Sequence, residues 1–426
     1  MHLLSIPRHQ LETTPRDYLR MLAATVGLRG QAADRRRFEA EFAEYVGCRH
    51  AIAVPSARVG LDLVLSHLGI EPGCEAIVPA FNYFVVIERF LDHGIRPVFA
   101  DIRRSDLNVD PNEVEALITP RTRAILATHM FGYPCDMDAL THLAKRSGLT
   151  LIEDCAHATG SEYAGRHVGT FGRAGIFSFS VLKLITTFGG GMITSNDDDL
   201  AVAIREQSAG WKAKGARKQG LKRFFKGFVM DIGTRTLPFS VVSWPGLRVA
   251  RMAKPDIQRN IMTQRPCRIT GWNPEPTASL RPFQIALGLA QLHRVEELIE
   301  KRQRVTAWLD EELADTGPVS LLRQSTKVRH NGMYYGILAD RAQELSQYLF
   351  KHGVDTETSE YCNCAELEIY RDYGRHCPVA RDVQRRIVRL PNHPALTRKD
   401  VRRIGKAIRS FYETAAVVAP SVAPAR

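Results

Sequence analysis

The chain has 426 residues and a net charge of +12; 44% of its residues are hydrophobic and 24% are charged. This composition is ordinary for a globular protein, and the length allows two or three domains whose core needs neither disulfides nor metals. No segment offers the roughly 20 uncharged apolar residues that a membrane-spanning helix requires.

The eight cysteines are scattered, and only Cys362 and Cys364 lie close together. A single intervening residue is shorter than the usual spacing of paired zinc ligands, and no His/Cys pair follows at a finger-like distance. We therefore expect no metal site and a reduced, cytoplasmic protein. The N-terminus lacks the apolar stretch of a signal peptide, because Arg8, His9 and Arg16 interrupt its apolar residues.

After an N-terminal arm (residues 1–34), residues 35–206 alternate between helical and strand patterns. The predicted helices are Arg35–Tyr45, Gly60–Leu68, Val85–His93 and Pro111–Ile118, and the predicted strands are Ala51–Val54, Ala76–Val78, Pro97–Asp101, Ala124–Thr128 and Thr150–Asp154. Short apolar strands that alternate with helices are typical of a mainly parallel sheet covered on both faces. We predict a large α/β domain over residues 35–206, with ligands at the carboxyl ends of its strands.

Residues 207–270, here named the basic segment, interrupt this rhythm. They hold 14 Lys and Arg against two acidic residues, so they account for the whole net charge. Gly227, Gly233, Pro238 and Pro245 are expected to break any long helix in this region. We interpret the basic segment as an insertion.

A helical pattern returns at Arg281 and continues to about Leu298, which suits one long helix between a large and a small domain. Residues 271–412 are predicted to contain this helix and a small C-terminal α+β domain. The tail, residues 413–426, is rich in Ala, Val and Pro and is expected to be disordered.

The strongest chemical signal lies between Leu151 and Thr194. A predicted strand ends on Asp154, Lys183 follows 29 residues later, and a glycine run comes soon after. A lysine amine can form a Schiff base with the aldehyde of pyridoxal phosphate (PLP), and a carboxylate keeps the cofactor's ring nitrogen protonated. A lone strand-end Asp is more often a turn residue and a lone Lys a surface charge. The prediction of a PLP site therefore depends on order, spacing and neighbours.

These neighbours resemble the DegT/DnrJ/StrS family of PLP-dependent sugar aminotransferases. The matching stretches cover most of the chain; they include IEDCAHATGSEYAGRHVGTFG and FSFSVLK around Asp154 and Lys183, FEAEFAEYVGCRHAIAV, VPAFNYFVVIERFLDHGIRPVFADI and ITPRTRAILATHMFGYPCDMDAL before them, and FQIALGLAQLHRVEE, CPVA and LPNHPALTRKDV after them. The resemblance implies the PLP-dependent transferase fold type I. In that α/β fold, a large domain with a mainly parallel sheet covered by helices is joined to a small C-terminal α+β domain.

The resemblance also implies residue roles. Lys183 is the Schiff-base lysine, Asp154 pairs with the pyridine nitrogen, and His157 lies beside the ring oxygen. Tyr83 falls where an aromatic ring stacks on the pyridine, and Ser178 where a serine binds the cofactor phosphate. The family usually forms a homodimer whose active sites are each completed by the neighbouring subunit.

Several positions depart from the family's pattern. The phosphate loop, usually Ser-Gly-Thr before a helix, reads Ser56-Ala57-Arg58, and Arg58 can offer a charge-assisted contact to the phosphate or to a substrate carboxylate. Other departures are Ser180, Leu184, Phe188, Gly189, Thr277 and Ser279. We expect the changed positions to line the substrate side of the pocket.

The family does not normally carry a region like the basic segment, and three interpretations stay open. It is a solvated, partly disordered loop, a platform for the diphosphate of a nucleotide sugar, or a peripheral contact with an anionic membrane. Aromatic residues interleaved with cations favour membrane contact, which we adopt as the hypothesis. Nucleic-acid binding is the weakest option, because no recognition motif accompanies the charge.

The predicted function is a PLP-dependent aminotransferase that moves an amino group from an amino acid to a keto group of a nucleotide-linked sugar. The resemblance implies glutamate as the donor and a role in surface-polysaccharide or related amino-sugar synthesis. Two alternatives stay open: a different PLP reaction on a related substrate, and a weakened, cofactor-binding protein with a regulatory or scaffold role. Lys183 argues against the family's 3-dehydratase branch, which has a histidine at this position.

Overall fold

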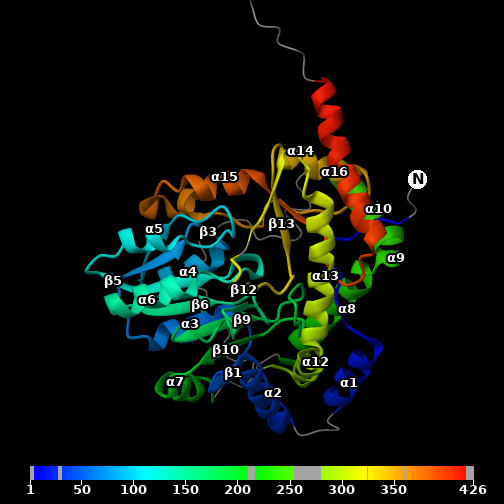
Figure 1. Cartoon of the computed structure of the whole chain (residues 1–426). Helices are drawn as coiled ribbons and strands as arrows, with labels where there is room; N and C mark the ends of the chain where they lie inside the picture. Colours follow the sequence, from blue (N-terminus) through cyan, green and yellow to red (C-terminus); the bar gives the residue numbers. More distant parts are fainter. Residues whose placement is uncertain are drawn as a thin grey trace, which may run out of the picture.

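The computed structural model describes residues 4–26, 31–209, 216–253, 280–323, 325–358 and 360–418. A large domain surrounds a seven-stranded sheet, and a smaller domain holds a three-stranded sheet beside it (Figure 1). Within the described ranges no helix has both the length and the apolar character needed to cross a membrane. The α/β fold class predicted from the sequence is confirmed.

The central sheet has the strand order β1-β10-β9-β6-β5-β2-β4. Its strands are β1 (His50–Val54), β2 (Glu75–Pro79), β4 (Arg96–Ala100), β5 (Thr122–Thr128), β6 (Thr150–Asp154), β9 (Ala174–Ser178) and β10 (Gly191–Ser195). The strands from β9 to β4 are parallel, whereas β10 runs antiparallel to both of its neighbours. Nearly every strand residue is buried, because helices cover both faces of the sheet.

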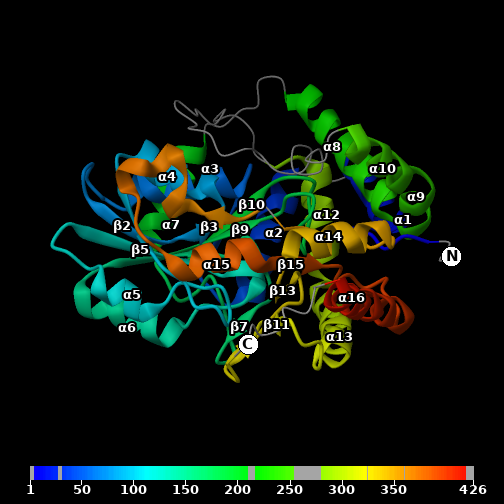
Figure 2. The same ribbon diagram turned by 90° about the horizontal axis from the view of Figure 1, so that it is seen from above.

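Helices form the outer layers of the large domain. Figure 2 shows α3 (Ala57–His67), α4 (Phe84–Asp92) and α7 (Asp198–Ala209) on one side of the sheet, and α5 (Pro111–Ala116) and α6 (Met137–Ser147) on the other. Two further helices, α1 (Pro15–Thr25) and α2 (Gln31–Val46), pack against α12 (Pro282–Leu292). The N-terminal arm thereby adds α1 to the large domain.

The long helix predicted from Arg281 to Leu298 is two helices, α12 and α13 (Val295–Leu313). Arg294 lies between them with φ −118° and ψ 4°, and its guanidinium binds the carboxylate of Asp17 at 2.8 and 2.9 Å. The prediction of one continuous helix is therefore wrong. The apolar spacing continues across the break because residues of both helices belong to the same hydrophobic core.

The small domain is built on an antiparallel sheet with the order β11-β13-β15. Its elements are β11 (Val319–Leu321), β13 (Tyr335–Ala339), β15 (Ile387–Leu390), α14 (Ala342–Lys351), α15 (Pro378–Arg386) and α16 (Arg398–Val418). Because α16 continues to Val418, the prediction of a disordered tail from residue 413 is wrong up to that residue. Residues 419–426 lie outside the described ranges.

The basic segment forms helices where the structure describes it: α8 (Ala216–Thr234), α9 (Thr236–Pro238), the π-helical turn η2 (Phe239–Ser243) and α10 (Trp244–Ala253). The expectation that Gly227 and Gly233 break a long helix is wrong, since α8 runs through both. A Cβ atom at Gly227 would lie 2.2 Å from the Phe188 ring, so the missing side chain lets α8 approach the large domain. Residues 210–215 and 254–270 lie outside the described ranges.

The described helices of the basic segment contact both domains. Phe224 of α8 makes edge contacts with Tyr18 and Phe283, at centroid distances of 6.3 and 5.8 Å. Trp244 of α10 packs on Phe350 of α14, with ring centroids 4.1 Å apart. The segment therefore bridges the outside of the molecule from the large domain to the small one (Figure 1).

Candidate active site

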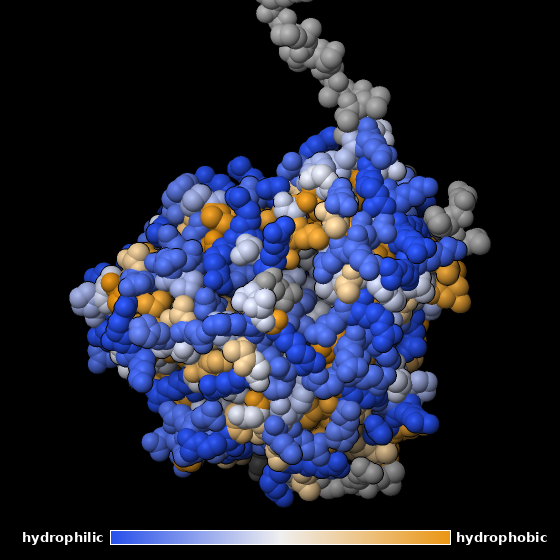
Figure 3. Space-filling view, in the orientation of Figure 1, coloured by the Kyte–Doolittle hydropathy of each residue, from blue (hydrophilic) through white to orange (hydrophobic). Residues whose placement is uncertain are grey.

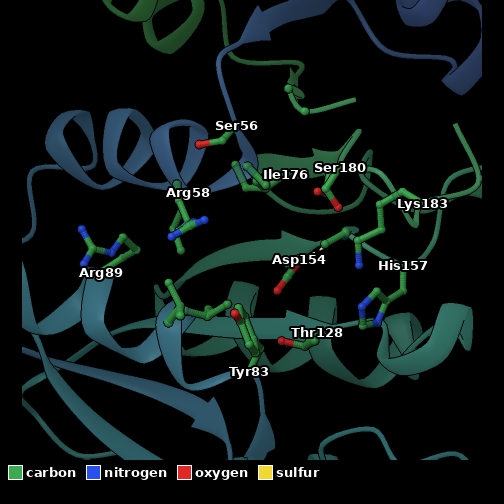
Figure 4. A pocket seen from close by; sticks show the side chains of 18 of the residues that line it. Ser56, Arg58, Tyr83, Arg89, Thr128, Asp154, His157, Ile176, Ser180 and Lys183 are labelled. Atoms are coloured by element: carbon green, nitrogen blue, oxygen red, sulfur yellow. Dashed lines mark hydrogen bonds between the residues drawn. The ribbon is translucent and has the colours of Figure 1, made fainter. Parts of the chain in front are cut away.

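A cavity of about 470 Å³ lies at the carboxyl ends of β5, β6 and β9, where parallel α/β sheets usually bind ligands. It is lined by every site residue predicted from the sequence: Ala57, Arg58, Tyr83, Asp154, His157, Ser178 and Lys183. Figure 4 shows Lys183, Asp154, His157 and Tyr83 converging on it from different elements. The structure thus brings together residues that are separated by more than a hundred positions in the sequence.

Asp154 ends β6 and faces the cavity. Its Oδ1 accepts a hydrogen bond of 3.0 Å from the backbone N–H of Ala156, which fixes the carboxylate at the strand end. Burial raises the pKa of this carboxyl group, although the Ala156 N–H and the charge of Lys183 oppose the shift. A cation placed beside Asp154 would therefore be held strongly, because the carboxylate has few other partners.

Lys183 lies in the loop between β9 and β10, opposite Asp154 (Figure 4). Burial lowers the pKa of its ammonium group to about 8, with Glu360 and Asp154 acting in the other direction and Arg389 lowering it further. Its Nζ is 5.9 Å from the centroid of the Tyr334 ring. A lysine with such a pKa is partly uncharged at slightly alkaline pH, so it can act as a nucleophile and as a proton carrier.

His157 is held as a neutral ring. Its Nδ1 accepts a hydrogen bond from the backbone N–H of Phe131 at 3.3 Å, so the proton resides on Nε2 and is donated to the hydroxyl of Tyr361 at 2.8 Å. Burial and the charge of Lys183 keep the His157 pKa well below its usual range, in agreement with this tautomer. The imidazole is thereby oriented as a hydrogen-bonding group.

The N-terminus of α3 forms the opposite end of the cavity. Ser56 caps the helix, with its Oγ accepting from the backbone N–H of Val59 at 3.3 Å. The first N–H groups of the helix, at Ala57 and Arg58, have no acceptor within the helix, which favours an anion at this position. Gly191 packs beside them: a Cβ atom there would lie 2.8 Å from the Ala57 nitrogen and 2.5 Å from the Phe177 oxygen.

The small domain contributes residues that sequence reasoning did not identify. Glu360 and Tyr361 line the cavity, because the following strand β14 (Cys362–Asn363) pairs with β3 (Phe81–Asn82) just before Tyr83. Thr128, at the end of β5, was also missed, although its place at the end of a predicted strand was a usable signal. No local pattern marked Glu360 or Tyr361, because a long-range strand pairing places them.

A second buried carboxylate stabilises the loop behind Asp154. Glu153 accepts hydrogen bonds of 2.7–2.8 Å from the backbone N–H groups of Gly169, Phe171 and Gly172, and contacts His129 Nε2 at 3.2 Å. Glu153, His129 and Cys155 lie close enough to hold a metal ion. The oxygens of Glu153 are already engaged by the backbone, so this cluster is structural.

The departures from the family's pattern fall into three groups. Arg58, Ser180, Phe188 and Gly189 line the cavity. Leu184 is buried and is not among the lining residues, so the expectation that it lies on the substrate side is wrong. Thr277 and Ser279 lie outside the described residues.

The sheet topology and this cavity together define a PLP-dependent transferase of fold type I. Residues 19–234 and 272–409 match the sequence model of the DegT/DnrJ/EryC1/StrS aminotransferase family. The chain belongs to this family, and it is an enzyme of the aminotransferase class. Membership implies dependence on PLP.

Named relatives agree with this assignment. The chain is 34% identical over 314 residues to a GDP-perosamine synthase of Caulobacter vibrioides, covering 74% of this chain and 71% of that protein. It is 30% identical over 380 residues to a GDP-perosamine synthase of Escherichia coli O157:H7, covering 88% and 90%. The structure of Helicobacter pylori PseC, an aminotransferase involved in the biosynthesis of pseudoaminic acid, superposes with a TM-score of 0.76 at 22% identity, covering 96% of this chain and all of that one. At that identity, the last comparison shows the fold alone.

Proposed function

We propose that the enzyme transfers an amino group from glutamate to a keto group of a nucleotide-linked sugar, and that the product serves surface-polysaccharide or related amino-sugar synthesis. The observation that carries this proposal is the placement of Lys183 and Asp154 in the lining of one cavity, with the N-terminus of α3 at its end. The GDP-perosamine synthases similar to this chain support the sugar substrate.

The lining residues fit PLP on structural grounds. The half-buried carboxylate of Asp154, which accepts one hydrogen bond from the described residues, that of the Ala156 N–H, suits a protonated ring nitrogen. Ser178 and the free N–H groups of Ala57 and Arg58 suit the phosphate, and Tyr83 offers an aromatic face. Each of these roles is part of the proposal.

Bound PLP supplies the aldehyde that accepts the amino group and the ring that takes up electrons when the donor loses its α-proton. Lys183 carries that proton between two carbon atoms, because a pKa of about 8 lets its amine both accept and release a proton near neutral pH. Asp154 would keep the ring nitrogen charged, and neutral His157, whose ring nitrogens are engaged by Phe131 and Tyr361, would lie beside the ring oxygen.

The proposal is tested by titrating the purified, PLP-loaded protein with glutamate while its absorbance spectrum is recorded. Conversion of the cofactor band to that of the pyridoxamine form, reversed by a nucleotide-linked keto sugar, is the expected result. Aspartate and alanine serve as comparison donors. A cofactor spectrum that glutamate leaves unchanged contradicts amino transfer and favours the regulatory or scaffold alternative.

We also propose that the active enzyme is a cytoplasmic homodimer whose neighbouring subunit completes each cavity, as the family resemblance implies. Light scattering over a concentration series, combined with subunit mixing, tests this. Two inactive variants, one at Lys183 and one altered in a partner-facing residue, are expected to restore activity when mixed if sites are shared. A monomer with full activity contradicts the proposal.

A contact with an anionic membrane through α8–α10 is proposed as well. Exposed apolar side chains recur at helical spacing along α8 (Leu221, Phe225, Val229 and Ile232) and continue at Val241, Val242 and Val249. In Figure 3 apolar side chains reach the surface at the edge where Figure 1 places α9. Arg248 lies beside this surface, and the net positive charge of the basic segment complements anionic lipid.

Sedimentation with vesicles tests whether the apolar surface of α8–α10 binds an anionic membrane or another partner. Wild-type protein is expected to bind vesicles that contain phosphatidylglycerol and not vesicles of phosphatidylcholine alone. The Val241→Glu/Val242→Glu variant is expected to lose binding, whereas Val202→Glu, on an exposed site of α7, keeps it. Equal binding by both variants contradicts the membrane contact.

A further inference from the structure

The face of α8 that turns toward the large domain presents two cations to the cavity. Along this face Gly220 lies beside Phe283, Phe224 contacts Tyr18, and Gly227 abuts Phe188. These contacts fix the rotation of the helix, and Arg223 and Lys226 consequently line the cavity. The opposite face of α8 carries the exposed apolar side chains, so the two faces differ in character.

The guanidinium of Arg223 reaches the turn at Gly189. Its Cδ, Nε and Nη1 lie 3.8–3.9 Å from the position that a Cβ atom of Gly189 would occupy. A long side chain at position 189 would meet Arg223. The absence of a side chain at Gly189 therefore leaves room for the guanidinium of Arg223 at the edge of the cavity.

These cations have no acidic partner among the described residues. Neither Arg223, Lys226 nor Arg58 forms an ion pair there, although Arg and Lys residues elsewhere in the chain form many. Burial lowers the pKa of Arg223, and burial together with the charge of Arg223 lowers that of neighbouring Arg281. Guanidinium groups that repel one another in a partly buried place are stabilised by an anion.

The cavity's own carboxylates do not supply that anion. Asp154 lies at the end of β6 on the cavity floor, and Glu360 is paired with Arg389 of the small domain. The N-terminus of α3 accounts for one phosphate, that of the cofactor. The side chains of Arg223 and Lys226 on α8, and that of Arg58 at the start of α3, are therefore left for a ligand that carries further anionic charge.

We propose that Arg223 and Lys226 of α8, together with Arg58, bind the diphosphate of the nucleotide-linked substrate. A planar guanidinium can bind two phosphate oxygens at once, and an ammonium adds a point charge for the neighbouring phosphate. The site is provided by the same chain that carries Lys183. This inference rests on the proposed function, because it names how that substrate is recognised.

The test measures binding of GDP, UDP and inorganic pyrophosphate to the PLP-loaded enzyme by calorimetry. The Arg223→Gln/Lys226→Gln variant is expected to bind all three about 10- to 100-fold more weakly, since two charge-assisted contacts are lost. Lys222→Gln, which removes one positive charge from the solvent-facing side of α8, is expected to change affinity less than about 2-fold and to keep activity. The PLP content of the double variant is expected to equal that of the wild type.

Three results overturn the proposal. The first is unchanged affinity for GDP and pyrophosphate in the double variant. The second is a loss of PLP from that variant, which assigns Arg223 to the cofactor phosphate. The third is a raised KM for glutamate with unchanged GDP affinity, which assigns the cations to the donor carboxylates. Reaction of the wild-type enzyme with glutamate is scored separately, so failure of the proposed function is distinguished from failure of the diphosphate site.

Discussion

The floor and the mouth of the cavity are built in different ways. The floor is made of strand ends and short loops of the central sheet, and its charged groups, Asp154 and Lys183, are half-buried and line the same cavity. The mouth is made by α8, whose cations have no acidic partner among the described residues and whose outer face is apolar. The difference indicates that the floor is organised to hold a cofactor permanently, and the mouth to bind an anionic substrate that dissociates after each turnover.

The largest effect is expected at Lys183 on the floor. Lys183→Met is expected to lower amino transfer by roughly 10⁴-fold or more, because among the described residues no other lysine lies beside Asp154 on the floor to carry the proton. In the PLP-free protein the same change is expected to raise stability at pH 7 by about 1–3 kcal/mol, because the burial cost of the charged amine is removed.

The pH dependence of stability tests whether the charged Lys183 amine destabilises the PLP-free protein. With a folded-state pKa of about 8 and a higher unfolded value, the unfolded chain binds more protons between these pH values. Wild-type stability should therefore rise from pH 8 toward pH 10, and Lys183→Met should lack this rise. Thermal unfolding of both PLP-free proteins measures it, and parallel curves contradict the assignment.

The next effect is expected at Asp154. Asp154→Asn is expected to lower activity by roughly 10²–10³-fold, because the ring nitrogen loses its charged partner. Burial raises the pKa of this carboxyl group. The ionised carboxylate therefore lowers the free energy of unfolding of the PLP-free protein once the pH has risen through that pKa, and this loss is absent in acid. The variant should therefore be the more stable protein at pH 7 without PLP and should gain less stability on adding PLP, as melting curves will show.

A change behind the floor should affect stability more than chemistry. Glu153→Gln is expected to cost about 2–4 kcal/mol of unfolding free energy, because an amide N–H₂ then faces backbone N–H donors. Urea denaturation measures this. The exposed Glu115→Gln, which breaks an ion pair with Arg146, serves as control and should cost less than about 0.5 kcal/mol.

The smallest effect is expected from the mouth. Gly227→Val is expected to lower the free energy of unfolding by about 1–3 kcal/mol, because the new side chain pushes α8 away from Phe188. Gly246→Ala in α10 has no neighbour within 4 Å and is expected to add up to about 1 kcal/mol, because alanine favours the helix. Denaturant midpoints check both, and equal shifts would show that α8 does not rely on close packing there.

Sequence reasoning was most successful where signals are local. The strands ending at Thr128 and Asp154, and the pair Asp154 and Lys183, follow from apolar runs and from a motif whose residues are close in sequence. It was wrong where long-range packing decides the outcome. The helix break at Arg294 depends on the carboxylate of Asp17, and Glu360 and Tyr361 reach the cavity only because β14 pairs with β3.

The helix α8 shows a further limit. Glycines normally weaken helices, yet Gly227 is retained inside one because Phe188 occupies the place of its side chain. Sequence reasoning left open whether its cations are solvated, bind a diphosphate or contact a membrane, and it adopted the membrane contact, whereas the rotation of the helix directs Arg223 and Lys226 into the cavity. Rotation depends on the partner surface and could not be obtained from the segment itself.

The double anchoring of the basic segment has a mechanical consequence. Its α8 is fixed to the large domain through Phe224 and Gly227, and its α10 to the small domain through Trp244. A rotation of the small domain relative to the sheet must therefore either shear Trp244 across Phe350 or pull on α8. Either way, such a rotation would change the position of Arg223, so the helices α8–α10 couple the cation-lined end of the cavity to the relative position of the two domains.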